Sequence, residues 1–106
     1  MKQIYDRQCP LARTAEVLEG RWTLLILRDL SRNGPRRFED FRQSLTGITP
    51  STLSARLKQL EDFGVVTREF YAMNPPRANY VLTDSGKALR PILKAMRAWG
   101  EANTSQ

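Results

Sequence analysis

The chain has 106 residues, of which 41% are hydrophobic and 26% charged, and this is the size and composition of one globular domain, expected over residues 1–106. It contains no histidine and a single cysteine, Cys9, which excludes zinc sites of Cys and His ligands, catalysis by a Ser-His-Asp or Cys-His set, and an internal disulfide. The six glycines stand singly, so the chain has no glycine-rich phosphate loop. We expect a protein that is not an enzyme and holds no metal or cofactor.

The apolar residues are dispersed along the chain. The longest purely aliphatic run, Leu24 to Leu27, is far shorter than the roughly 20 residues of a membrane-spanning helix. The first seven residues contain no apolar core of a signal peptide. Together with the scarcity of cysteine, these features predict a soluble, cytoplasmic protein without a membrane partner.

The formal net charge is +6, and thirteen of the seventeen basic residues are arginine. The planar guanidinium suits phosphate groups and the edge of guanine, so nucleic acid is the leading candidate partner. Many small proteins carry a similar charge that only keeps them soluble. The order of the elements along the chain has to decide between these two interpretations.

Two helices are predicted first. The segment from Pro10 to Leu18 has apolar residues on one helical face, a proline suited to the first turn and Gly20 just beyond its end. A second apolar stripe begins at Trp22 and ends before Asn33-Gly34-Pro35, a strong helix terminator.

Two shorter helices joined by a tight turn follow. Phe38, Phe41 and Leu45 repeat at helical spacing until Gly47. Thr49 is suited to cap the next helix and Pro50 to occupy its first position, and the inward leucines of that helix are expected in residues 51–63. Two helices in this arrangement form a helix-turn-helix unit.

The segment from Val65 to Leu82 changes to β-branched and aromatic residues interrupted by Asn74-Pro75-Pro76-Arg77. This pattern predicts a β-hairpin with a proline-closed loop that carries an exposed arginine. Such a hairpin projects from the helices as a wing.

A last helix is expected from Thr83, with a bend at Pro91 and an apolar stripe that ends at Trp99. The helix-turn-helix already supplies a core, so we expect this helix and the first one to form the interface of a homodimer. Packing within one chain is the alternative.

Over residues 9–106, the sequence motifs at the boundaries of these predicted elements resemble those of the HxlR-type winged helix-turn-helix family of bacterial transcriptional regulators. The matching features, in chain order, are Cys9-Pro10, Gly20-Arg21-Trp22-Thr23, Gly34-Pro35-Arg36-Arg37-Phe38, Gly47-Ile48, Leu53-Ser54-Ala55-Arg56-Leu57-Lys58-Gln59-Leu60-Glu61, Gly64-Val65-Val66, Pro75-Pro76-Arg77, Tyr80-Val81-Leu82-Thr83 and Gly86. The resemblance implies a mainly helical fold with a β-hairpin wing, and a homodimeric, sequence-specific regulator of promoters, often a repressor.

Helix 51–63 is the expected recognition helix. With Leu53, Leu57 and Leu60 inward, its N-terminal half is expected to enter the major groove of double-stranded DNA. The residues placed toward bases or phosphates are Ser51, Thr52, Ser54, Ala55 and Lys58. An ordinary solvated helix face is the alternative for these side chains.

Three arginines outside this helix are candidates for the DNA backbone. Arg36 and Arg37 precede the first helix of the motif, where they can contact phosphates or remain a solvated pair of charges. Arg77 at the wing is expected to enter the minor groove or hold a neighbouring phosphate. A two-fold dimer then predicts an inverted repeat with half-sites roughly 10 to 21 base pairs apart.

Control by a signal has two candidate sites. Cys9 precedes the first helix, where the helix dipole favours the thiolate; some members of the resembling family respond to oxidants through such a cysteine, and a buried, inert cysteine is the alternative. Trp22, Trp99 and Tyr5 could also line an apolar pocket for a small effector.

A winged helix that docks onto proteins and binds no operator is the alternative function.

Overall fold

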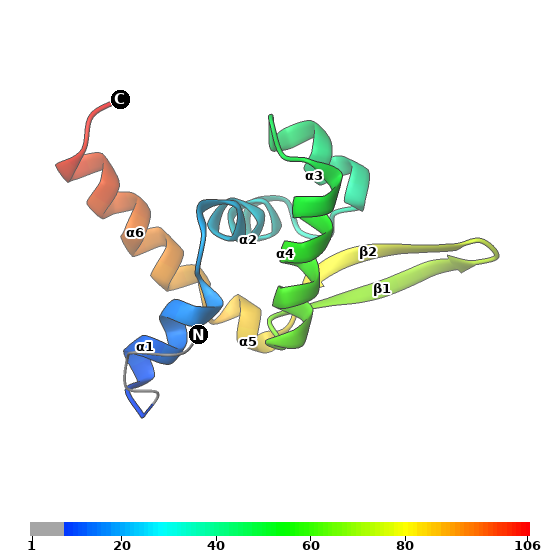
Figure 1. Ribbon diagram of the computed structural model, residues 1–106, viewed down its shortest axis with the longest axis horizontal. Helices are drawn as coiled ribbons and strands as arrows, with labels where there is room; N and C mark the ends of the chain where they lie inside the picture. Colours follow the sequence, from blue (N-terminus) through cyan, green and yellow to red (C-terminus); the bar gives the residue numbers. More distant parts are fainter. Residues whose placement is uncertain (1–7) are drawn as a thin grey trace.

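The computed structural model describes residues 8–106 (Figure 1). The elements in chain order are α1 (Pro10–Val17), α2 (Arg21–Asn33), α3 (Phe38–Ser44), α4 (Pro50–Asp62), β1 (Val66–Met73), β2 (Pro76–Leu82), α5 (Asp84–Lys87) and α6 (Arg90–Asn103). This mainly helical chain with one antiparallel hairpin confirms the winged helix-turn-helix expectation. No helix within residues 8–106 has the length and hydropathy needed to cross a bilayer.

The core lies where α2, α3 and α4 meet the base of the hairpin. Side chains that share nearly complete burial come from all four parts: Ile26, Leu27 and Leu30 of α2, Phe41 of α3, Leu53, Leu57 and Leu60 of α4, and Val66 of β1. The helical spacing of the leucines gives α4 one continuous apolar face. Burial of that face fixes the rotation of α4 about its axis.

The hairpin extends away from the helices (Figure 1). Its strands pair from Val66 opposite Leu82 to Met73 opposite Pro76, with an irregularity between Phe70 and Ala72. Such a bulge inserts one extra residue into a strand and increases the local twist.

The base of the hairpin is attached to the helical body through Tyr80. The backbones of Arg36 and Tyr80 exchange two hydrogen bonds, of 3.0 and 2.7 Å, and the Tyr80 ring lies edge-on to Phe41 at 6.1 Å between centroids. Burial raises the pKa of Tyr80, and the Glu61 carboxylate raises it further. The wing is therefore positioned relative to α3 by both backbone and side-chain contacts.

The C-terminal segment contains two helices, so the expectation of one helix bent at Pro91 is wrong. Thr83 caps α5 as expected, its Oγ1 accepting from Gly86 N at 3.1 Å. The chain then turns, and Pro91 lies in the first turn of α6. Proline lacks the N–H that an internal helical position must donate, whereas the first turn does not need it.

Gly86 allows α5 to approach the end of α4 closely. A β-carbon at this position would lie 2.1 Å from the carbonyl oxygen of Val65, which no side chain can tolerate without movement of the backbone. Thr83 Oγ1 also donates to the Gly64 carbonyl at 2.7 Å. These contacts connect the start of the C-terminal segment to the point where α4 leads into the wing.

Candidate nucleic-acid interface

The N-terminus of α4 is organised by hydroxyl groups. Thr49 Oγ1 accepts from the backbone N–H of Thr52 at 3.2 Å, and Pro50 occupies the first turn; both features confirm the sequence expectation. Thr49 Oγ1 also lies 3.0 Å from Thr52 Oγ1 and 3.4 Å from Ser51 Oγ. This end of α4 therefore carries a cluster of short polar side chains.

The predicted rotation of α4 is confirmed. Leu53, Leu57 and Leu60 are at most 1% exposed. The polar and small residues on the opposite side face solvent: Ser51, Ser54, Ala55 and Lys58 are exposed, and Thr52 is partly buried at the shoulder. A groove of a duplex can approach this face without any unfolding of the helix.

The charged residues of α4 have different partners. Lys58 Nζ lies 3.5 Å from Asp62 Oδ1, with both side chains more than 60% exposed, so this pair is weak and readily exchanged for a phosphate. Arg56 is partly buried and donates from Nη1 to Gln59 Oε1 at 2.6 Å. Lys58 is therefore the more available of the two cations.

Arg77 is exposed, as predicted, but it belongs to β2 and not to the loop. It lies opposite Ala72, and only Asn74 and Pro75 form the turn between the paired residues Met73 and Pro76. The short turn places the Arg77 guanidinium near the end of the wing, on a hydrogen-bonded strand that limits its motion.

The wing also carries large apolar side chains that the sequence analysis did not single out. Phe70, Tyr71 and Met73 are 48%, 53% and 69% exposed, and Tyr71 is the residue left without a partner at the bulge. The alternation of residues along a strand could not predict the exposure of these side chains, because a bulge shifts which face the following residues occupy.

Arg37 and Asp40 form an exposed pair at the start of α3. Asp40 Oδ2 accepts from the Arg37 backbone N–H at 2.9 Å, and the guanidinium lies 3.3 Å from Oδ1. The backbone hydrogen bond, followed by the guanidinium, lowers the pKa of Asp40, while Asp40 and Tyr71 raise the pKa of Arg37. Arg37, Arg68 and Arg77 line one open cleft between α3 and the wing.

Arg36 is turned inward, toward Asp29. Its guanidinium lies 3.8 Å from Asp29 Oδ2, and only 23% of its side chain is exposed. It also donates to the Asp40 carbonyl oxygen at 3.5 Å. The structure therefore favours a structural role for Arg36 over a phosphate contact.

Asp29 is a carboxylate of α2 that lies buried in the protein. It is 4% exposed, accepts a hydrogen bond from the Ser44 hydroxyl, and pairs with Arg28 at 3.4 Å. A buried carboxylate needs such partners. The position of Asp29 among the apolar residues of α2 was the sequence signal that could have predicted its burial.

The two candidate sites for a signal are placed differently. Cys9 is the N-cap residue of α1 and is exposed. Trp22 packs against the core, whereas Trp99 is 64% exposed, and Tyr5 lies outside the described residues. Within residues 8–106 no cluster of side chains could hold a metal ion.

Comparison with known proteins decides the family. The HxlR-like helix-turn-helix family matches residues 17–106. The chain belongs to this family. The match confirms the resemblance drawn from the sequence.

The similarities to this HxlR-like protein extend over nearly its whole length. The uncharacterized HTH-type transcriptional regulator YybR of Bacillus subtilis is 38% identical over 96% of this chain and 82% of its own. The redox regulator HypR in its reduced form superposes with a TM-score of 0.82, at 37% identity over 90% of this chain and 93% of that one. A putative MarR-family regulator of Porphyromonas gingivalis has a TM-score of 0.82, at 30% identity; the match covers 96% of this chain and 99% of that chain. All are named as regulators and none as an enzyme, in agreement with the expectation from the sequence.

Proposed function

We propose that this HxlR-like protein is a transcriptional regulator that recognises specific DNA sequences with α4 and its wing. The observation that carries the proposal is the outward face of α4, where Ser51, Ser54, Ala55 and Lys58 are exposed while the leucines of the same helix are buried. Hydroxyl groups can donate to and accept from base edges, and alanine permits contact with a thymine methyl group. Arg77 and Arg37 would hold the flanking backbone through phosphate contacts.

We propose that the active form is a homodimer. In α6 the described side chains include no buried residue, and Ile92, Met96 and Trp99 are 40%, 44% and 64% exposed. Leu11 of α1 is 77% exposed. A second copy can cover this apolar surface symmetrically, and the paired recognition helices would then read an inverted repeat. By occupying such a site in a promoter, the cytoplasmic dimer would act as a repressor.

Thiol control is part of the same proposal. Cys9 is exposed at the start of α1, the helix assigned to the dimer. Oxidation of one Cys9 thiol from each subunit would form an intermolecular disulfide, releasing two protons and passing two electrons to an oxidant such as diamide. The expected result is a covalent dimer with altered DNA affinity; a diamide-treated dimer that binds DNA unchanged would contradict it.

The test of DNA recognition begins with selection of bound fragments from the genome that encodes the protein. Fluorescence anisotropy then compares a selected duplex with a random one at several salt concentrations. We expect a preference of about a thousandfold or more for the selected duplex, and a changed sequence preference for Ser54→Ala. Equal affinity for both duplexes, with and without reductant, would contradict the proposal.

A further inference from the structure

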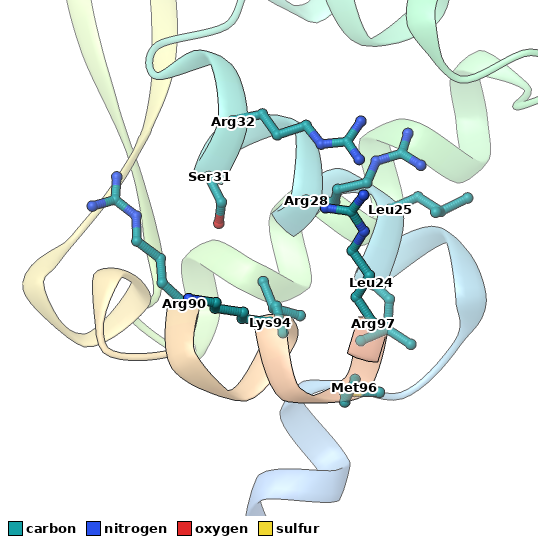
Figure 2. Close-up of a pocket in the computed structure, with 10 residues that line it drawn as sticks. Leu24, Leu25, Arg28, Ser31, Arg32, Arg90, Lys94, Met96 and Arg97 are labelled. Atoms are coloured by element: carbon teal, nitrogen blue, oxygen red, sulfur yellow. The ribbon is translucent and has the colours of Figure 1, made fainter. Parts of the chain in front are cut away.

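An open cavity of about 480 Å³ lies between α2 and α6 (Figure 2). Its apolar lining comes from both helices: Leu24 and Leu25 of α2, and Leu93 and Met96 of α6. The volume falls within the range of sites that bind small organic molecules. The lining offers contact to an apolar body.

Among residues 8–106, five cations and no carboxylate border the same cavity. The basic residues are Arg28 and Arg32 of α2 and Arg90, Lys94 and Arg97 of α6. Figure 2 shows the side chains of Arg28, Arg32 and Arg97 extending toward one end of the cavity, and that of Arg90 extending the other way.

Most of this positive charge is not neutralised by the carboxylates of the described residues. Arg28 pairs with Asp29 at 3.4 Å, and Arg97 reaches Glu101 only at 3.9 Å, between exposed side chains. Arg32, Arg90 and Lys94 form no ion pair with a carboxylate of residues 8–106. Like charges held close together repel each other, so an anion between them is favoured.

Two buried polar atoms at the cavity also have no hydrogen-bond partner in the part of the chain that the structure describes. These are Arg28 Nε and Ser31 Oγ, and in Figure 2 the Ser31 hydroxyl points from α2 toward α6. Buried donors without an acceptor are unfavourable and uncommon. An acceptor supplied by a ligand would satisfy one or both of them.

We propose that this cavity binds a small organic anion with an apolar body, such as an aromatic carboxylate. The carboxylate would lie at the end of the cavity toward which Arg28, Arg32 and Arg97 extend, and the apolar body would contact Leu24, Leu25 and Leu93. The site uses neither the outward face of α4 nor the wing, so this inference goes beyond the proposed DNA recognition and can fail separately from it.

The direct test uses 1-naphthoate as the probe in isothermal titration calorimetry with the full chain. We expect saturable binding at one site per subunit. The uncharged isostere 1-naphthamide should bind at least about tenfold more weakly. Inorganic phosphate, which has charge but no apolar body, should not displace 1-naphthoate at a tenfold excess.

Variants locate the site. Arg32→Gln and Arg97→Gln should each weaken 1-naphthoate binding about tenfold, because each removes a charge-assisted contact. Lys87→Gln is the matched control, since Lys87 is exposed on α5 and does not line the cavity; it should change the affinity less than twofold. Ser31→Ala should also weaken binding, and it should raise the melting temperature of the free protein by removing an unpaired buried hydroxyl.

The outcomes separate this site from the DNA interface. Arg32→Gln should lose no more affinity for a selected duplex than Lys87→Gln does. Displacement of 1-naphthoate by phosphate, equal binding of 1-naphthamide, or equal effects of the Arg32 and Lys87 variants would each overturn the inference. Absence of any 1-naphthoate binding in a protein that still selects DNA would overturn it while leaving the proposed function intact.

Discussion

Two amphipathic helices of similar length, α4 and α6, use their apolar faces differently. Each has a proline in its first turn, and they span 13 and 14 residues. In α4 the leucines are buried within the chain, whereas in α6 the large apolar side chains Ile92, Met96 and Trp99 stay 40% to 64% exposed.

The contrast shows what each helix offers to a partner. The apolar face of α4 is already covered, so its short polar side chains remain available to a polar partner such as a duplex. The large apolar side chains of α6 remain exposed among the described residues, and burial of such side chains is favourable. A second copy of α6 supplies a surface of the same chemistry.

The largest expected effect follows from truncation in the covered face. Leu57→Ala removes a fully buried side chain and should lower the free energy of unfolding by about 2–5 kcal/mol. Urea denaturation followed by circular dichroism measures this loss. It should be the same at every protein concentration, because Leu57 is covered by its own chain; a loss below about 1 kcal/mol would contradict that placement.

Truncation in the uncovered face should act on assembly. Trp99→Ala should raise the dissociation constant of the dimer by tenfold or more, since a large aromatic residue at an interface often contributes about 2 kcal/mol. Sedimentation equilibrium over a range of concentrations measures it. Glu101→Ala, also exposed on α6, is the matched control. Unchanged self-association of Trp99→Ala would remove α6 from the interface.

At the wing, Arg77→Ala should weaken binding to all duplexes and flatten the dependence of affinity on salt. Removal of one cation from a DNA phosphate should reduce the slope of log K against log salt concentration by about 0.9. Anisotropy titrations on a selected and a random duplex measure both effects, with Lys87→Ala as a control of equal charge change. A slope equal to that of the control would exclude Arg77 from binding to the DNA backbone.

The smallest expected effect is the pH dependence of the cap at α3. The lowered pKa of Asp40 means that its contribution to stability is present above its unfolded pKa, about 3.9, and is lost as the pH falls through the lower folded value. The difference in free energy of unfolding between the wild type and Asp40→Asn should therefore be constant near neutral pH and narrow below about pH 4. A difference that widens in acid would contradict the assignment.

The sequence was sufficient where a feature depends on residues close together in the chain. The spacing of Leu53, Leu57 and Leu60 determined the rotation of α4, and Thr49 with Pro50 determined its start. These signals are local, because capping and helical periodicity operate within one or two turns.

The features missed from sequence depend on distant partners. Asp29 is buried because Ser44, fifteen residues away, donates to it, and Arg36 turns toward the same carboxylate. The close approach of Gly86 to Val65 places α5 beside the end of α4, and periodicity within one helix does not reveal this contact. The clustering of basic side chains from α2 and α6 could not be predicted from the sequence, because it depends on the fold that places both helices beside one cavity.

The most direct test of the central claim compares α4 and α6 on a bound duplex. An iron chelate that cleaves DNA is attached to Ser54→Cys or to Glu101→Cys, each in a Cys9→Ser background, on a selected genomic fragment. The account predicts cleavage within both half-sites from position 54 and none above background from position 101. Cleavage from position 101 with none from position 54 would contradict it.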